Sequence, residues 1–374
     1  SDDSADVTFP DPPVPEPNDF QFDVFGRSAT DVYACGDRGA MFHFDGTEWT
    51  TVDMGTGRGI TTIWGLPGDG TLYAVGHGGN IWRNTGGSWG GMTSGISQDL
   101  FGLGQFEGKI HAVGDKGAIL RLNGSSWGGV PSQMWILDEN GGPTDTLSTN
   151  EDLASIVAVN EFFLGGAFND PDFDDERIGR YGTKGMVLAS ADPADFPTPD
   201  PPDPAWTDLP DWILRPISGE QTSPYEWVYA MTSDPADYDR NLMGTSEGWL
   251  FRMTEDLGKK VWAKFYPSVT SDPDRGIRDI WLDVAGNIYM VTDAGTVVYQ
   301  TFDYNFTEAT GERVTLYDGP VSLHGIWGTG PDNLFIVGNM DETLLMASHD
   351  QGTHDFSLTE VKLEFPASKA ADVV

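Results

Sequence analysis

The chain has 374 residues, with 21 Lys and Arg against 58 Asp and Glu, so its formal net charge at pH 7 is −37. Direct nucleic-acid binding is excluded on this ground, because such binding draws its affinity from Lys and Arg that neutralise phosphates. Hydrophobic residues make up 39% and aromatic residues 12% of the chain. That is enough for a sizeable core, which excludes a disordered acidic chain.

The single cysteine, Cys35, cannot form an intrachain disulfide, so the fold needs no oxidising compartment. No stretch approaches 18 consecutive apolar residues, and we expect no membrane insertion. The first residues lack the basic start and apolar core of a signal peptide, which favours a cytoplasmic origin, with a processed extracellular protein as the alternative. The acidic excess is typical of proteins from saline habitats and predicts a marine or halophilic source.

Residues 1–19 are rich in Pro and Asp and cannot build a hydrophobic core. We expect them to be an extended acidic arm that docks against the folded part of the chain or a neighbouring subunit. Residues 367–374 are expected to be a short C-terminal tail.

Three segments after the arm align almost without gaps: TDVYACGDRGAMFHFDGTEW from Thr30, GTLYAVGHGGNIWRNTGGSW from Gly70, and GKIHAVGDKGAILRLNGSSW from Gly108. Their glycines, at 36, 76 and 114, are 40 and 38 residues apart, and their tryptophans, at 49, 89 and 127, keep the same intervals. Weaker copies at 161–166, 241–253, 287–300 and 333–348 bring the number of units to seven. A period near 40 residues indicates a repeat architecture.

Each unit reads as four strands, such as 61–65, 72–76, 80–83 and one that begins at Trp89, with Gly-containing turns between them. Sheets of this length bury their faces when they are stacked around an axis. The pattern therefore predicts an all-β fold, a seven-bladed β-propeller with four-stranded blades over residues 20–366. A sandwich would not repeat one unit seven times, and the coils of a β-helix are much shorter than 40 residues.

Three insertions interrupt the repeats, at 131–152, 167–184 and 191–205. We expect the first two, as loops, to lie side by side on one face of the disc. The third, which is rich in Pro, should project from the opposite face as a stiff extended segment.

The combination of W-G, Y-A-V-G-x-x-G-x-I and G-x-x-W resembles the bacterial and phage β-propellers of the BNR or Asp-box group, which includes sialidase-like and photosystem-assembly-factor-like proteins. Degenerate Asp-boxes strengthen the resemblance. They comprise Thr254, Asp256 and Gly258 before Trp262, and Ser348, Asp350 and Gly352 before Phe356. In that group the boxes lock hairpins, so the resemblance implies a structural role and no catalytic one.

Sialidase activity is not expected. The resemblance would require an early Arg in an F-R-I-P-like segment, and the nearest string, Leu214 to Ile217, lies mid-chain. We therefore predict no catalytic residues and no enzymatic activity. Any two of the 58 acids could stand at the separation that glycoside hydrolysis requires, so paired carboxylates are not informative here.

The 167–184 insertion holds alternating acids, and Asp170, Asp172 and Asp174 are the candidate calcium ligands. The alternative is a solvated acidic loop without a metal, and no other cofactor is expected. His349 and His354 have no Cys partner that would indicate zinc and are interpreted as strand or turn residues.

Four aromatic residues lie in or beside the insertions and are the candidate partner-binding residues: Trp135, Tyr181, Tyr225 and Trp227. A hydrophobic cluster that pins the long loops is the alternative interpretation.

Two function classes stay open. The first is a non-catalytic structural or interaction protein that binds other protein subunits in a larger assembly, specifically a capsid or tail protein in a bacteriophage virion. The second is an extracellular or periplasmic propeller that binds or cleaves glycans in its central channel.

Overall fold

The computed structural model describes most of the chain between residues 23 and 362. The described ranges are 23–65, 70–106, 108–131, 133–137, 143–148, 153, 155–157, 163–166, 186–190, 212–215, 217–218, 228–234, 237–246, 248–256, 259–265, 276–301, 313–320, 322–338 and 343–362. Within these ranges the fold is all-β, and no helix is long and apolar enough to cross a membrane.

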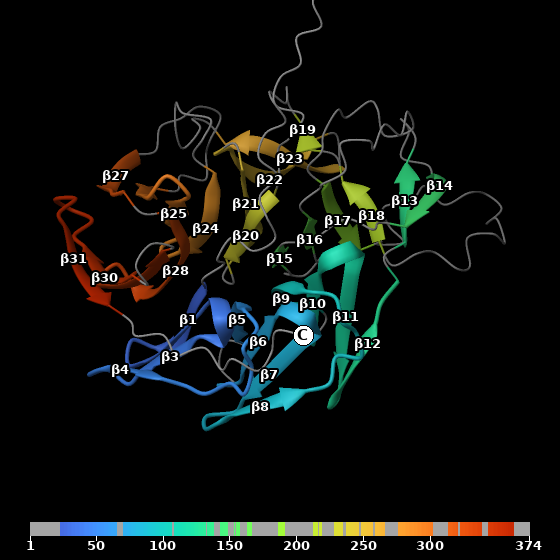
Figure 1. The fold of residues 1–374 in the computed structure, drawn as a ribbon. Coiled ribbons are helices and arrows are strands. Elements are labelled where there is room, and N and C mark those ends of the chain that lie inside the picture. The colour runs from blue at the N-terminus through green and yellow to red at the C-terminus, as the bar shows by residue number, and fades with distance from the viewer. Residues whose placement is uncertain are drawn as a thin grey trace, which may run out of the picture.

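Six blades of four antiparallel strands follow the chain order (Figure 1). The first three hold β1 Asp23–Ser28, β2 Asp31–Cys35, β3 Met41–Phe44 and β4 Trp49–Thr51; then β5 Ile60–Gly65, β6 Leu72–Gly76, β7 Asn80–Asn84 and β8 Trp89–Met92; then β9 Leu100–Phe106, β10 Lys109–Gly114, β11 Ala118–Asn123 and β12 Ser126–Gly129. The last three hold β20 Val228–Asp234, β21 Asp237–Thr245, β22 Leu250–Asp256 and β23 Lys259–Phe265; then β24 Ile277–Leu282, β25 Ile288–Thr292, β26 Thr296–Gln300 and β27 Arg313–Asp318; then β28 Leu323–Gly330, β29 Asn333–Gly338, β30 Thr343–His349 and β31 Phe356–Lys362.

Between the third and fourth of these blades the chain forms a mixed sheet of six strands in the order β14-β13-β18-β17-β16-β15. Its strands are β13 Gln133–Leu137, β14 Pro143–Ser148, β15 Ser155–Val157, β16 Phe163–Gly166, β17 Met186–Ser190 and β18 Trp212–Arg215. The short strand β19, Ile217–Ser218, then pairs in parallel with β23 at the outer edge of the next blade.

The predicted seven-bladed propeller with four strands in every blade is therefore wrong: the regular blades number six, and the fourth repeat unit of the sequence lies in the mixed sheet. The expected loop at 131–152 is the cause. It contains the hairpin of β13 and β14, and β13 pairs in parallel with β18, Met134 opposite Trp212. An outer strand offers unpaired N–H and C=O groups, and a segment such as QMWIL has the residues to pair with them.

Strand boundaries in the clear repeats agree with the sequence analysis. In the second blade the expected strands at 61–65, 72–76 and 80–83 correspond to β5, β6 and β7 within one residue. Each of the three clear repeats turns from its second to its third strand through a 3₁₀ turn, at Asp37–Gly39, His77–Gly79 and Asp115–Gly117. The third residue of each turn, Gly39, Gly79 or Gly117, has a positive φ, which explains the glycine that recurs there.

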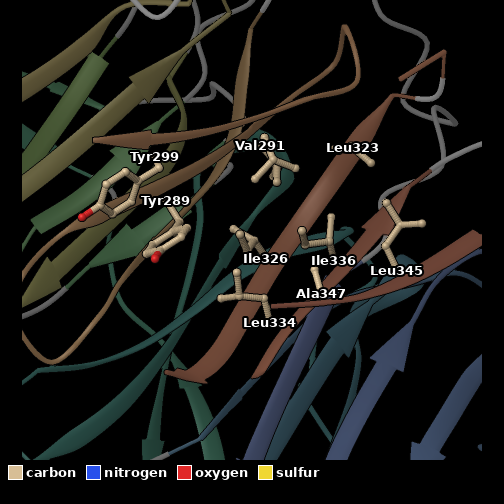
Figure 2. Packing of buried hydrophobic residues seen from close by; sticks show 10 residues of the cluster. Tyr289, Val291, Tyr299, Leu323, Ile326, Leu334, Ile336, Leu345 and Ala347 are labelled. Carbon is tan, nitrogen blue, oxygen red and sulfur yellow. The ribbon is translucent and has the colours of Figure 1, made fainter. Parts of the chain in front are cut away.

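The first strands of the sheets contact one another in a closed ring, β1-β5-β9-β15-β20-β24-β28, and they surround the axis of the disc (Figure 1). Neighbouring sheets pack face to face through apolar clusters. Figure 2 shows one of them, where Ile326, Leu334 and Ile336 of the last blade lie against Tyr289 and Val291 of the blade before it.

The repeated tryptophans pack between sheets, as the sequence predicted. The ring of Trp89, in the second blade, packs edge to face against the ring of Tyr33, in the first blade, with 5.4 Å between the ring centroids. In the same way Trp127, in the third blade, packs against Tyr73, in the second blade, at 6.5 Å. Cys35 is buried, as expected of a small core residue.

Candidate interaction site at the bulges of the inner strands

Five inner strands carry an extra residue at the same level. In β5 the register passes from Ile60 opposite Gly76 to Thr62 opposite Val75, so Thr61 is the extra residue, and its buried Oγ1 donates to the carbonyl oxygen of Val75 at 3.1 Å. The same shift occurs in four more first strands. We call the extra residues the bulge ring: Thr61, Phe101, Tyr229, Arg278 and His324.

A bulge redirects its side chain away from the regular alternation of the strand, and bulges are common next to functional sites. Because the inner strands contact one another around the axis, the five bulges lie at one end of the ring of strands. They combine two aromatic rings, a guanidinium, an imidazole and a hydroxyl. Tyr and Arg are the residue types that contribute most to protein interfaces.

Contacts join members of the ring. The guanidinium of Arg278 lies over the ring of Tyr229, 4.1 Å from its centroid. Arg278 also contacts Asp293, with Nη2 3.3 Å from Oδ2. Burial raises the pKa of Asp293, and the charge of Arg278 opposes that shift. Burial, aided by the positive charge of Arg278, lowers the pKa of His324 to about 3, so this imidazole is neutral at neutral pH.

Two carboxylates lie one residue beyond this level, on β1 and β24. Asp23 accepts from the backbone N–H of Val24 at 2.7 Å and of Ile63 at 2.8 Å. The carboxylate of Asp279 accepts hydrogen bonds from the backbone N–H groups of Ile280 and Ile326, both at 2.8 Å. Each carboxylate thus joins its inner strand to the next one. Burial raises the pKa of both, and the nearby Asp279 charge raises that of Asp23 further.

The turns between second and third strands end on the same side as the bulges, since the second strand runs antiparallel to the first. His77 Nδ1 lies 2.7 Å from Asp99 Oδ2, and Asp99 Oδ1 accepts from the backbone N–H of Gly78 at 2.7 Å. These bonds lower the pKa of Asp99 against the opposing effect of its burial. The contacts tie the turn of the second blade to the segment that enters the third.

A second polar network lies at the opposite end of the last two blades. Gln351 Nε2 donates to Tyr289 Oη at 3.1 Å and to Asp283 Oδ2 at 2.8 Å. Tyr289 Oη lies 2.9 Å from His349 Nδ1, and His349 Nε2 lies 3.3 Å from His354 Nδ1. His349 and His354, which the sequence analysis interpreted as strand or turn residues, are therefore in contact. In the described part of the chain, no three His, Cys, Asp or Glu side chains are placed to hold a metal ion.

The second predicted Asp-box lies at the hairpin between β30 and β31. Asp350 Oδ1 accepts from the backbone N–H of Gly352 at 2.8 Å and of Thr353 at 3.2 Å, and these bonds lower the pKa of Asp350. Ser348 lies in β30, opposite Ser357. In the first box, Thr254 and Asp256 lie in β22, and Gly258 lies outside the described residues.

The other predicted site residues are not brought together in the described part of the structure. Trp135 lies in β13, paired with Thr146 and Ile213. The remaining candidates fall outside the described residues and stay predictions: Tyr181, Tyr225 and Trp227 for partner binding, and Asp170, Asp172 and Asp174 for calcium.

Sequence reasoning missed the bulge ring altogether. Arg278, Tyr229 and His324 differ in type from blade to blade, so the repeat alignment treats them as variation. A usable signal was present in the short apolar strings before each repeat, such as RDIWL and LHGIWG, where a charged or polar residue breaks the strand pattern.

No family model matches the sequence, and no curated protein matches it either. Solved structures do. YCF48 from Cyanidioschyzon merolae is 15% identical, with a TM-score of 0.55 over 87% of this chain and 95% of that one. A streptogramin B lyase structure is 10% identical, with a TM-score of 0.57 over 93% and 96%, and YCF48 bound to D1 peptide is 12% identical, with 0.53 over 93% of each chain. At such identities the likeness shows the fold, a β-propeller, and nothing more specific.

Proposed function

We propose that this chain is a non-catalytic interaction protein that binds a protein partner at the end of the propeller where the bulge ring lies. The observation that carries the proposal is the coincidence of five bulges at one level, with Tyr229 and Arg278 stacked there. A repeated departure from regular pairing disrupts the ladder of hydrogen bonds, and bulges are over-represented next to active sites, where they re-aim a side chain. YCF48, one of the similar structures, was solved with a bound peptide.

The net charge of −37 indicates the charge that the surface of the partner should carry. An acidic protein attracts a basic partner and repels an acidic one, and this steering weakens as salt screens the charges. We therefore expect association with a basic protein surface to slow as the ionic strength rises.

The test compares two variants in one capture experiment from the native source. Tyr229→Ala with Arg278→Ala should lower the recovery of the specific partner at least about tenfold, as expected for interface residues of these types. The control is Arg83→Ala, which removes another Arg that lies near a Tyr ring, 5.9 Å from the centroid of Tyr73. Equal recovery with both variants, at unchanged circular dichroism, would refute the proposed site.

A finer proposal is that the assembly is a bacteriophage particle in which this chain is a capsid or tail subunit. Its support is the acidic surface, which disfavours adventitious binding to packaged DNA, and the repeat architecture without the sialidase residues. Purified particles should then contain the chain in a fixed multiple of the particle symmetry. Turnover of a glycan by the isolated chain would instead favour the carbohydrate-active alternative.

A further inference from the structure

Two imidazoles at the hairpin between β30 and β31 lie end to end. His349 Nε2 and His354 Nδ1 are 3.3 Å apart, the ring centroids are 5.5 Å apart, and the ring planes differ by 24°. At this centroid separation, 3.3 Å is close to the shortest distance that two ring nitrogens can have, so the line between them runs along both rings. Each nitrogen therefore points at the other, as in a hydrogen bond, rather than toward a third point where a metal ion would sit.

The direction of each hydrogen bond in this network follows from its far end. The amide nitrogen Nε2 of Gln351 can only donate, and it donates to the carboxylate of Asp283 and to Tyr289 Oη. Tyr289 Oη, which accepts there, has its own hydrogen for His349 Nδ1 at 2.9 Å. His349 therefore carries its hydrogen on Nε2 and donates it to His354 Nδ1. These bonds connect the blade of β24 to β27 with the hairpin of the last blade.

A further proton on the pair of imidazoles disrupts this order. On His354 Nδ1 it would face the N–H of His349, with 3.3 Å between the two nitrogens. His349 can accept it only by moving its own hydrogen to Nδ1, where that hydrogen would face the one that Tyr289 donates. His349 is 1% exposed, so water does not solvate an added charge there. Burial, aided by the charge of His354, lowers the pKa of His349 against the opposing charge of Asp350.

The groups packed around the pair include a tyrosine and three more carboxylates. Tyr299 of β26 contacts both imidazoles, at 4.6 and 5.8 Å between ring centroids. Asp283 lies on the turn between β24 and β25, Asp332 on the turn between β28 and β29, and Asp355 on the hairpin itself. Burial and the charge of Asp283 raise the pKa of Tyr289, so this hydroxyl keeps its hydrogen near neutral pH. The imidazoles are thus the groups of the network suited to change charge in that range.

The hairpin itself is strained at the second imidazole. His354 has a φ of 60°, in the left-handed region that costs energy for a residue other than glycine. Its backbone N–H donates to the carbonyl oxygen of Asp350 at 2.7 Å, and its ring accepts from His349. Loss of the ring contact removes one of the bonds that offset the strain, so the hairpin should loosen when the two imidazoles separate.

We propose that His349 and His354 form a pH-sensitive latch between the last two blades. Above about pH 6.5, where exposed imidazoles are neutral, the pair joins the hairpin to Tyr289. As the pH falls below that value, the open hairpin takes up a proton that the latched one excludes, so the latch opens. Because His349 N donates to the carbonyl oxygen of Pro331, at the end of β28 away from its bulge, the latch does not involve the proposed partner site.

The test is amide hydrogen exchange of the full chain at about pH 7.5 and about pH 5.5, on either side of the usual imidazole value. Each rate is divided by the intrinsic rate at its pH. The reporters are the N–H groups of Asp350 and His354, which donate across the hairpin turn. Uptake of one proton changes an equilibrium by about tenfold per pH unit, so their protection should fall about tenfold. The N–H of Gly295, on a turn without histidine, should keep its protection.

Three variants identify the titrating group. His354→Asn removes the ring and keeps a residue type that tolerates the left-handed backbone, so protection should be equal at the two pH values. Tyr289→Phe keeps both imidazoles but removes the hydroxyl that His349 contacts, so protection should already be low at about pH 7.5. The matched control is His43→Asn, because His43 contacts the carboxylate of Asp31 at 2.8 Å and lies in the first blade. This control should retain the tenfold fall.

Equal wild-type protection of the hairpin at the two pH values overturns the latch. A tenfold fall that persists in His354→Asn also overturns it, because another group would then be titrating. If His354→Asn leaves the hairpin unprotected at both pH values, Tyr289→Phe decides: wild-type protection at about pH 7.5 with the full tenfold fall would show that the connection to Tyr289 does not hold the hairpin.

Discussion

At the scale of single residues, the least expected feature is a carboxylate used as a strand connector. Asp23 and Asp279 each accept a backbone N–H from their own inner strand and one from the next. In a chain with 58 acids this role is invisible in the sequence, because it depends on which two carboxyls lie beside the neighbouring strand. Their raised pKa values mean that the fold favours the neutral carboxyl.

Asp279→Asn should change stability in a pH-dependent way. At about pH 5 the variant should lose about 1 kcal/mol, because the amide nitrogen cannot accept one of the two N–H bonds. As pH rises from the unfolded value of about 4 through the raised folded pKa, the folded wild type holds protons that the unfolded chain has lost, so its stability falls. Asn stays neutral and escapes this loss. The free-energy difference, measured by urea unfolding, should therefore shrink or reverse by about pH 8.5.

The control is Asp45→Asn, on an exposed turn where Asp45 accepts from Thr47 and Glu48 and has a lowered pKa. Its carboxylate stabilises the fold above the unfolded pKa, and that contribution is lost on acidification. Between about pH 5 and about pH 8.5 the cost of Asp45→Asn should therefore stay constant, whereas that of Asp279→Asn should shrink or reverse. A difference for Asp279→Asn that stays constant between the two pH values would contradict the account.

At the scale of the elements, the turn from second to third strand defines the repeat. In each clear repeat the third residue of the turn is a glycine with φ near +70°: Gly39, Gly79 and Gly117. The chain also approaches another segment there, since a Cβ on Gly79 would overlap the backbone oxygen of Ile96. The glycine pattern therefore reports both a left-handed backbone and close packing with the segment that leads to the next blade.

Three glycine-to-alanine changes in the second blade should separate these effects. Gly79→Ala should cost about 1–3 kcal/mol for the positive φ and about 1–3 kcal/mol more for the overlap. Gly86 has φ +95° with nothing within 4 Å of its Cβ position, so it should cost only the backbone part. Gly91→Ala has neither effect and should stay within about 0.5 kcal/mol of the wild type. Thermal unfolding of the three variants gives the order, and a cost for Gly86→Ala as large as for Gly79→Ala would exclude the contribution of the overlap.

At the scale of the whole molecule, the ring closes by side-chain packing. Among the described strands, the first blade consists of β1 to β4 and the last of β28 to β31, and neither blade takes a strand from the other. They meet through a cluster in which Val24, Val32 and Phe44 pack against Phe335 and Leu344. Closure therefore depends on apolar contact between residues about 300 positions apart in the sequence.

Phe335→Ala should open this closure. Phe335 is 2% exposed and lies 5.9 Å from Phe44 and 6.3 Å from Trp49 between ring centroids, so its loss should cost about 3–5 kcal/mol. Hydrogen exchange should accelerate in the first and last blades together. Phe251→Ala is the matched control, because Phe251 is 1% exposed but lies in the blade of β20 to β23. If Phe335→Ala accelerated exchange in the last blade alone, closure by this cluster would be disproved.

Much of the fold could be predicted from the sequence, because a strand and its turn are local. The spacing of Gly36, Gly76 and Gly114 indicated the propeller, and the strands of the second blade are placed within one residue. The number of regular blades was not predictable in this way. The pairing of β13 with β18 joins residues nearly 80 positions apart, and nothing local marks an edge as open to an added strand.

The candidate site was even less predictable from the sequence than the number of regular blades. The sequence by itself determined the all-β repeat, the glycine turns and the packing of Trp89 and Trp127 between sheets, because each follows from short-range periodicity and side-chain type. Only the tertiary structure decided that Tyr229, Arg278 and Asp293 meet, and that two carboxylates connect neighbouring inner strands. The physical reason is that the burial and pairing of a polar side chain depend on the neighbouring sheet, whose register no single repeat encodes.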